Sequence, residues 1–350
     1  MRLLILVNTL DCLDENSALL SNAFRRFGHE VILGEINGIA ADDYRCFIGG
    51  VLLPANGEPH HPGSAALGNR LTYFLDECQL IWVMSWPQDC VARDVWQMLW
   101  LASQHTPFVN SIEGLVFLNN KHALGHVLPK ENRAFSYISN DFSLLWKRYR
   151  QTPDEWWIAK PPNAGCGQDV FLLPPNGPNV RTILQSLTGN TVAQSALDNG
   201  GLGGFKAEYA ILQKFIPEVA QGEKRVIVTC GKAIAWHGRH ADANDHRSNI
   251  TQGGKPIAVD LHSNEIALAE LIGRKLMAHG INFIGIDMAY PYIIEFNVAY
   301  PGGLYDAGLT SGLDRSEQVA ELIVAQFKRT RHEAPTSPLR GSPAILPGRS

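Results

Sequence analysis

The chain has 350 residues, of which 45% are hydrophobic, so it can bury a large core and is long enough for two or three structural units. Its formal net charge is −4 and its lysines and arginines form no basic run, which gives no reason to expect a nucleic-acid-binding or membrane-surface protein. No run of about 18 apolar residues is present, so a membrane-spanning helix is not expected.

Six cysteines are spread along the chain without a CxxC pair. In a chain of this size such spacing is typical of free thiols in a reducing compartment, and we expect a cytoplasmic protein. The apolar run Leu3–Val7 is too short for a signal peptide because polar and acidic residues follow at once, and a core strand is the preferred interpretation.

Residues 1–118 alternate strands with helices, a pattern that predicts an α/β unit with a mostly parallel, Rossmann-like sheet. A stretch rich in proline, glycine and histidine, Gly49–Gly68, is expected to be a surface loop. The expected elements are strands at Leu3–Val7, Glu30–Leu33, Leu80–Met84 and Pro107–Asn110, with helices near Ser17–Phe27 and Ala92–Ser103.

Residues 119–218 are expected to form a second unit, and residues 219–330 a third. Within the second unit the glycine-rich run Asn199–Gly204 lacks a following helix start, so a plain surface loop is favoured over a phosphate-binding one. The tail, residues 331–350, contains four prolines and two glycines and is expected to be disordered. The expected strands are Trp156–Ala159, Val170–Leu173, Tyr209–Leu212, Arg225–Thr229, Ala233–His237, Phe283–Met288 and Tyr292–Phe296, and the expected helices are Val180–Leu187, Ser263–His279 and Ser316–Arg329.

The segment from Asp287 to Asn297 brings oxygen-bearing side chains to one place. Two strands joined by a tight turn would set Asp287 close to Glu295, and Glu295 and Asn297 share a face because they are two residues apart on one strand. Carboxylate and amide oxygens suit Mg²⁺ when nucleotide phosphates and water complete its shell. Taken alone, the segment supports a metal site and an ordinary hairpin with solvent-facing acids equally.

A second motif is a strand end followed by a glycine-rich loop. Gly165 and Gly167 would let backbone N–H groups approach phosphate oxygens, and Lys160 could reach a phosphate as a point charge. The lysine precedes the glycines, unlike in a Walker A loop, so a turn with a surface lysine is favoured on these residues alone. Cys166, between the glycines, is expected to be structural rather than nucleophilic.

Two further segments carry groups suited to a nucleotide or an anion. Gln213–Pro217 has the pattern of a link between domains, where backbone groups could bind a purine, and Glu223–Arg225 offers an acid for ribose and cations for phosphate. Arg239 and the run Arg247–Asn249, followed by Gly-Gly, suit a mobile lid that pairs with carboxylate or phosphoryl oxygens. A charged surface segment explains either pattern equally well.

In this order, the segments resemble the ATP-grasp superfamily and, within it, bacterial glutathione synthetase. The resemblance covers residues 108–300, whereas the earlier residues agree in pattern only, and it implies an ATP-grasp fold, α/β (α+β), behind an N-terminal Rossmann-like domain. It rests on six collinear motifs at the family's spacing: Lys121 after a short strand, Ile-Ala-Lys160-Pro, Gln213-Lys-Phe-Ile-Pro, Glu223-Lys-Arg225-Val, Arg247-Ser-Asn249 with Gly-Gly, and Gly285-Ile-Asp287 with Glu295-Phe-Asn297.

The resemblance implies a ligase that uses ATP to join a small carboxylate donor to an amine through an acyl phosphate. It implies Mg²⁺, with Mn²⁺ as an alternative, bound by Asp287, Glu295 and Asn297. Arg225, Arg247 and Asn249 would face the acyl phosphate and the acceptor. The implied contacts to ATP are Lys121, Lys160, Gly165, Gly167, Gln213, Phe215, Ile216, Glu223 and Lys224.

Several positions depart from the glutathione synthetase pattern on the substrate side. Met84-Ser-Trp86-Pro stands where the family has an arginine used for the thiol peptide, and Ala299–Asp306 stands where it has Ser-Pro-Thr and Arg-Glu. The glycine loop carries Ala164 and Cys166 where the family has glycines. We therefore expect the reaction type to be kept and the donor to differ, with a true glutathione synthetase as the alternative.

Two other functions share the fold, a kinase with a hydroxyl acceptor and a non-catalytic ATP-binding module. The set Asp287, Glu295 and Asn297 argues against the second, because a module without catalysis has no need for metal ligands. The expected partners are a small-molecule donor and acceptor, without nucleic acid or membrane, and a homo-oligomer is compatible with such folds.

Overall fold

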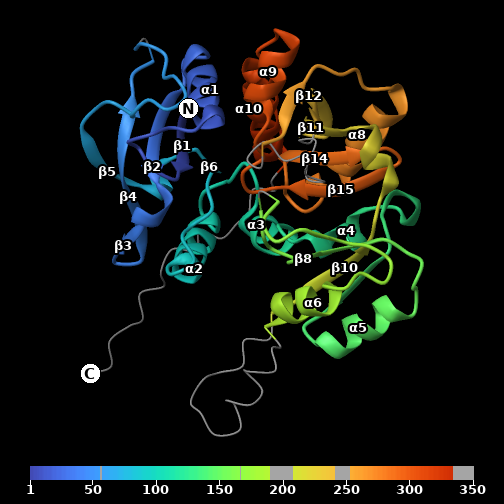
Figure 1. Ribbon diagram of the computed structural model, residues 1–350. Helices are drawn as coiled ribbons and strands as arrows, with labels where there is room; N and C mark the ends of the chain where they lie inside the picture. Colours follow the sequence, from blue (N-terminus) through green and yellow to red (C-terminus); the bar gives the residue numbers. More distant parts are fainter. Residues whose placement is uncertain (56, 166, 190–207, 241–252, 334–350) are drawn as a thin grey trace, which may run out of the picture.

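The computed structural model describes residues 1–55, 57–165, 167–189, 208–240 and 253–333, which contain three sheets (Figure 1). The predicted loop Asn199–Gly204, the lid residues Arg247 and Asn249, and Cys166 lie outside the described residues. Among the described helices, none is long and apolar enough to cross a bilayer.

The first sheet has the strand order β3-β4-β2-β1-β6, with β5 paired to β4. Strands β1, β2 and β6 run parallel, whereas β4 is antiparallel to β2, β3 and β5, so the sheet is mixed and the prediction of a mostly parallel one is wrong in its outer part. Its elements are β1 (Arg2–Val7), α1 (Glu15–Arg26), β2 (Glu30–Glu35), η1 (Ile36–Gly38), β3 (Ala40–Asp42), β4 (Arg45–Leu53), β5 (Arg70–Phe74), η2 (Leu75–Glu77), β6 (Leu80–Val83) and α2 (Ala92–Ser103).

Strand β4 passes through the start of the predicted loop Gly49–Gly68. Gly50 lies opposite Gly34 of β2, and a Cβ at Gly50 would come within 2.8 Å of the carbonyl oxygen of Leu33. Glycine therefore allows a close backbone approach inside a strand, although in sequence it suggests a loop. The predicted short strand Pro107–Asn110 is not a strand in the structure either, because it makes only isolated bridges, from Phe108 to Ile81 and from Asn110 to Ile281.

The N-terminal and C-terminal helices pack together. The Asp14 carboxylate caps α1 by accepting the backbone N–H of Ser17 at 2.8 Å, which satisfies one of the free donors of the first turn. Helix α10 (Ser316–Glu333) lies beside α1, and Arg26 forms an ion pair with Glu317 at 2.8 Å. Because α10 continues to Glu333, residues 331–333 are helical, which corrects the start of the predicted disordered tail.

The second sheet has the order β7-β10-β8-β9, and two helices cover one of its faces. Helices α5 and α6 bury Trp157 and Leu212 on that face, while Lys160 and Gln213 lie on the opposite face. Its elements and those leading into it are α3 (Ile112–Leu118), η3 (Lys121–Ala123), α4 (Leu124–Val127), η4 (Lys130–Asn132), β7 (Ser136–Ser139), α5 (Phe142–Arg150), β8 (Trp157–Lys160), β9 (Phe171–Leu173), α6 (Val180–Thr188) and β10 (Ala210–Lys214).

The third sheet is antiparallel, with the order β13-β12-β11-β14-β15. The predicted hairpin is confirmed, because Asp287 on β14 lies opposite Glu295 on β15, next to a register shift. Apolar side chains of α8 pack on one face, and those of α9 and α10 on the other. The elements are η5 (Pro217–Gln221), β11 (Glu223–Thr229), β12 (Lys232–His240), β13 (Lys255–Ile257), α8 (Ser263–Met277), β14 (Phe283–Ala289), β15 (Tyr292–Asn297) and α9 (Leu304–Ser311).

One buried side chain, Asn110, joins the end of the first sheet to the third. Its Nδ2 donates to the carbonyl oxygens of Phe283 and Val298, both at 2.8 Å. Its Oδ1 accepts the backbone N–H groups of Asn282 at 2.7 Å and Phe283 at 2.9 Å. Asn110 is 2% exposed and all four of its hydrogen-bonding positions are used, so it fixes the chain after β6 against β14 and β15.

We expect Asn110→Ala to lower the free energy of unfolding by about 3 kcal/mol or more, because each buried group left without a partner costs about 1–3 kcal/mol. Urea unfolding followed by circular dichroism measures the change. Asn132→Ala serves as the control, because the half-buried Asn132 donates one hydrogen bond, to the Pro291 carbonyl at 2.8 Å, and should cost about 1 kcal/mol. Equal losses for the two variants would contradict the joining role of Asn110.

Candidate active site

A cleft of about 840 Å³, including its open mouth, lies between the free face of the second sheet and the third sheet. The lining divides into two chemical kinds, as for a ligand with an apolar ring and an anionic part. The apolar lining consists of Ile158, Val170, Phe215, Ile216, Val219 and Ile294. The charged lining includes Lys121, Lys160, Glu223, Arg239, Asp287 and Glu295.

The segment after β10 supplies part of the apolar lining. The backbone N–H of Phe215 is bonded to the Trp156 carbonyl at 3.0 Å, which holds the segment against β8. Within the described residues, the backbone N–H of the neighbouring Ile216 has no hydrogen-bond partner. Gln213 lines the cleft, its side-chain amide donates to Ser136 Oγ at 3.1 Å, and its contact with ATP stays a prediction. The segment thus offers apolar contact and a backbone donor, which are the groups that a purine needs.

Lys160 is a buried cation without a partner. It ends β8, is 4% exposed, and its ammonium makes no hydrogen bond or ion pair with the residues described. Burial lowers the pKa of this lysine to about 8, against the attraction of Glu295. Because an isolated buried charge is costly, the position favours an anionic ligand that would pair with it.

Lys121 and Glu295 meet across the charged part of the cleft. Lys121 Nζ lies 3.5 Å from Glu295 Oε2 and also donates to the carbonyl oxygen of Ala164 in the glycine loop. Burial acts to raise the pKa of Glu295, but the cations Lys121 and Lys160 outweigh it and lower that pKa. Glu295 is therefore a carboxylate at neutral pH, as a metal ligand has to be.

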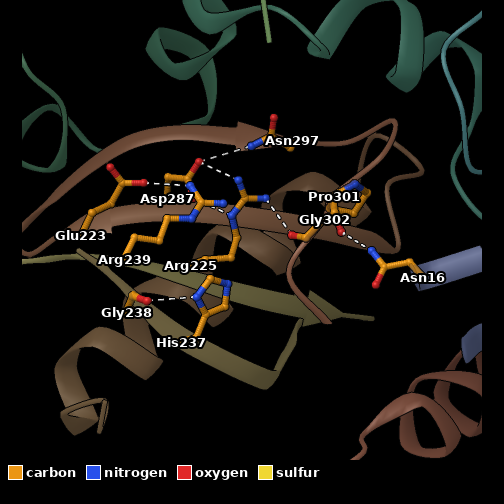
Figure 2. Close-up of polar contacts among 10 residues, drawn as sticks. All are labelled: Asn16, Glu223, Arg225, His237, Gly238, Arg239, Asp287, Asn297, Pro301 and Gly302. Carbon is orange, nitrogen blue, oxygen red and sulfur yellow. Dashed lines mark hydrogen bonds and ion pairs between the residues drawn. The ribbon is translucent and has the colours of Figure 1, made fainter. Parts of the chain in front are cut away.

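Asp287 is the centre of a buried ion cluster (Figure 2). Arg225 holds its carboxylate through two nitrogens, Nε to Oδ1 at 2.5 Å and Nη2 to Oδ2 at 2.9 Å. Arg239 Nη1 donates to Oδ1 at 3.1 Å and also to Glu223 at 3.0 Å, and Asn297 Nδ2 donates to Oδ2 at 3.4 Å. Pairing of this kind offsets the cost of burying the charges of Asp287, Arg225 and Arg239.

The four donors fill all the acceptor positions that a carboxylate offers. A metal ion bound to Asp287 would therefore displace at least one of them. Glu295 and Asn297 have further oxygen atoms, and together the three residues could hold Mg²⁺ if phosphate oxygens and water completed its shell. In the part of the chain that the structure describes, no group of three or more His, Cys, Asp or Glu side chains forms a metal site by itself.

Strand alternation separates the predicted residues of β11. Glu223 lines the cleft, but Lys224 points the other way and forms an ion pair with Glu265 of α8 at 2.8 Å. The structure thus corrects the prediction that Lys224 contacts ATP, because successive side chains of a strand face opposite sides. Arg225 is not part of the cleft lining either. Its guanidinium lies beneath the lining residues, bound to Asp287 and to the Gly302 carbonyl.

The cleft also contains a residue whose place the sequence did not reveal. The sequence motif places Arg239 with the lid run, but Arg239 lies on β12 opposite Glu223 and reaches Asp287. The alternation along β12 was visible in the sequence, whereas its register against β11 was not. In the glycine loop, Gly167 lines the cleft with a positive φ of 69°, but Gly165 does not line it, and its contact to ATP stays a prediction.

Comparisons with known proteins give a consistent result. The family described as prokaryotic glutathione synthetase, ATP-grasp domain, matches residues 130–309. Over 93% of this chain and the whole length of the relative, the sequence is 25% identical to a glutathione synthetase of Synechocystis sp.. Among solved structures, the fold is similar to D-cycloserine synthetase DcsG, with a TM-score of 0.62 and 13% identity over 93% of this chain and 99% of that one. It is also similar to the macrocyclase MdnC from Microcystis aeruginosa, bound with precursor peptide MdnA, with a TM-score of 0.60 and 12% identity over 93% and 100%.

We expect binding of a non-hydrolysable ATP analogue to weaken as the pH rises through about 8, because Lys160 must be protonated to attract phosphate. Lys160→Ala should weaken binding about 10- to 150-fold, as for the loss of a charge-assisted contact worth about 1.5–3 kcal/mol, and should remove this pH dependence. Calorimetric titration at several pH values measures both effects. Lys232→Ala, which removes an exposed lysine outside the cleft lining, should keep the pH dependence. An unchanged dissociation constant in Lys160→Ala would exclude this lysine from the site.

Proposed function

The chain belongs to the family of prokaryotic glutathione synthetases with an ATP-grasp domain, and from this premise we propose that its cleft binds ATP and activates a small carboxylate for attack by an amine. As a family member it is an ATP-dependent ligase that forms amide bonds. The observation that carries the proposal for the cleft is the buried, unpaired ammonium of Lys160 in a lining shared with Asp287 and Glu295.

The purine would lie against the apolar lining, where the free backbone N–H of Ile216 can donate to a ring nitrogen. Lys160 and Lys121 would then bind phosphate oxygens, and Lys121 would exchange its contact with Glu295 for the phosphates. Glu223 is already bound to Arg239, so a ribose hydroxyl would join an existing contact. Gly167, which lines the cleft, would bring a backbone N–H close to the phosphates.

The residues that would hold Mg²⁺ are Asp287, Glu295 and Asn297, where the ion would reduce the negative charge on the phosphates. Beside them, Arg225 and Arg239 place two fixed positive charges next to Asp287. Their positions are determined before any ligand binds, so stabilising charge that develops there would need little reorganisation.

The reaction would proceed in two displacements. An oxygen of the donor carboxylate attacks the terminal phosphorus of ATP, which gives an acyl phosphate and ADP. The amine then attacks the acyl carbon, its nitrogen loses a proton, and phosphate leaves. The arginines would stabilise the charge on the phosphoryl oxygens in both steps. Arg247 and Asn249 lie outside the described residues, and their contact with the acceptor remains part of this proposal.

The same proposal includes the organisation of the whole chain. Residues 1–118 would contribute the substrate domain, residues 119–218 the subdomain that covers ATP, and residues 219–330 the subdomain with the metal ligands. This division is supported by the three sheets, each of which lies within one of the ranges. We further propose a cytoplasmic location, small-molecule or peptide substrates and, by analogy with such folds, a homo-oligomer.

We expect Asp287→Asn and Glu295→Gln each to abolish amide formation, because Mg²⁺ would lose a carboxylate ligand in each case. The measurement is ADP release with a screen of acid and amine pools at saturating Mg²⁺, combined with the mass of the product. Circular dichroism establishes that the variants fold, and Asp76→Asn, at a half-exposed ion pair with Arg45, is the control. Near-native rates in both variants would refute the metal assignment, and a phosphorylated product would indicate a kinase.

The structure supports a donor other than the thiol peptide of glutathione synthetase. Trp86 packs edge-on against Trp96, with ring centroids 4.9 Å apart, at the position where the family has an arginine. Arg70, a possible substitute, is already paired with Asp11 and Glu35 at 3.5 and 3.4 Å. After β15, the half-buried Asp306 has its pKa raised, first by burial and then by Glu15. Among the described residues, an apolar ring and a carboxyl group thus stand at positions where the family pattern has cations, which disfavours an anionic donor.

We expect a specificity constant below about 10⁴ M⁻¹s⁻¹ with γ-glutamylcysteine and glycine, which is under the usual range for a natural substrate. The reason is that a carboxylate left unpaired in a buried pocket is strongly disfavoured. Steady-state kinetics of ADP release, compared with the best acid–amine pair from the screen, tests the expectation. A value for γ-glutamylcysteine at or above that limit would identify a true glutathione synthetase.

A further inference from the structure

We propose that Asn16, in the N-terminal unit, is a positioning residue that fixes the loop after β15 and, through this loop, the guanidinium of Arg225 (Figure 2). The inference rests on the proposed function, because it assigns Arg225 and Asp287 to the reacting centre. Asn16 itself is outside the cleft lining and need not touch a substrate.

The first link joins two parts of the chain that are far apart in sequence. Asn16 lies in the first turn of α1, is 2% exposed, and its Nδ2 donates to the carbonyl oxygen of Pro301 at 3.0 Å. The capping of α1 by Asp14 holds this turn in place. The loop after β15 is thus tied to the N-terminal unit by a buried hydrogen bond.

The second link joins the loop to the ion cluster. The Gly302 carbonyl accepts a hydrogen bond from Arg225 Nη1 at 3.1 Å. At Gly303, where φ is 114°, a Cβ would lie 3.0 Å from Arg225 Cγ and 3.0 Å from Nε2 of the buried His237. The loop is therefore packed against Arg225 with no spare room, and a shift of the loop would move the guanidinium that holds Asp287.

Asn16 makes one hydrogen bond and leaves one buried oxygen unpaired, which indicates a role in function more than in stability. Its Oδ1 is buried and has no partner within the described residues, which disfavours the folded state. Asn22, on the same helix, is better paired by comparison, because both its oxygen and its amide nitrogen make hydrogen bonds. Its Nδ2 donates to the His60 carbonyl at 2.7 Å, and its Oδ1 accepts the His60 N–H at 3.0 Å and Arg25 Nη1 at 3.2 Å. Asn22 thus stabilises the fold, whereas Asn16 contributes one bond, to the loop, and leaves an oxygen unpaired.

The two asparagines provide a matched pair of variants. Hydrogen–deuterium exchange of the full-length protein reports the mobility of residues 298–303 without any substrate. Calorimetry with Mg²⁺ and a non-hydrolysable ATP analogue reports the nucleotide site, and urea unfolding reports stability. Steady-state ADP release with the most active acid–amine pair from the screen gives kcat and the KM for ATP. Asn16→Asp is included because it keeps the size of the side chain but replaces the N–H donor by an acceptor.

In Asn16→Ala and Asn16→Asp we expect exchange in residues 298–303 to accelerate at least about tenfold and kcat to fall at least about tenfold, while the analogue affinity and the KM for ATP stay within about twofold. Asn22→Ala should lose stability but keep kcat and the slow exchange of this loop. The inference is overturned if Asn16→Ala leaves loop exchange and kcat unchanged, or if Asn22→Ala lowers kcat equally. Absence of amide formation in the unmodified protein would instead refute the proposed function, because the exchange measurement does not depend on turnover.

Discussion

The buried charge of Asp287 is the constraint on which the third sheet depends. A carboxylate that is 2% exposed would be strongly disfavoured without partners, and Arg225 and Arg239 supply them from two neighbouring strands. Both contacts require one register, in which β11 sets Arg225 opposite Asp287 and β12 sets Arg239 opposite Glu223. A shift of either strand by one residue would turn its arginine to the face of the sheet covered by α8, where Lys224 forms its ion pair with Glu265. The ion cluster and the strand pairing therefore specify each other.

The second sheet carries the complementary part of this arrangement. Lys160 has no partner among the described residues, and Lys121 has one neutral partner, the Ala164 carbonyl, and one long contact with a charge, Glu295. Without Lys214, which lines the cleft but pairs with Glu155 outside it, and counted with Arg225, the charged groups around the cleft are four cations and three carboxylates, so a cation remains in excess before any ligand is bound. An anionic ligand such as ATP can pair with it from the open side. The charges of the third sheet, Asp287, Glu223 and the two arginines, thus balance one another, whereas Lys160 on the second sheet would be paired by a ligand.

The sequence predicted those features that depend on local pattern. Alternation along one strand placed Glu295 and Asn297 on one face, and the hairpin with Asp287 followed from the short turn. The same alternation explains why Lys224 faces away from Glu223 and pairs with Glu265, although the family motif contains both Glu223 and Lys224. At Gly50 the sequence predicts a loop, because it does not show that the backbone of Leu33 lies in the space a Cβ would fill. The contacts of Arg239, Asn110 and Asn16 join distant segments, and their register depends on tertiary packing that no local pattern contains.

The buried atoms without partners near Arg225 belong to this arrangement. His237 Nε2, Arg239 Nε and Asn16 Oδ1 each lack a hydrogen bond within the described residues. Burial lowers the pKa of His237 to about 4, so the ring is neutral at pH 7 and adds no third positive charge beside the two arginines. Because its pKa in the unfolded chain is near 6.5, the unfolded state binds more protons between about pH 6.5 and 4, and the fold loses stability as the pH falls through that range. If these atoms were paired, the cluster would be more stable. The hydrogen bond from Arg225 to the Gly302 carbonyl, which joins Arg225 to the N-terminal unit, would then contribute less to its position. The unpaired atoms lie where the N-terminal unit meets the ion cluster that we propose as part of the reacting centre, and at such centres stability is commonly given up for function.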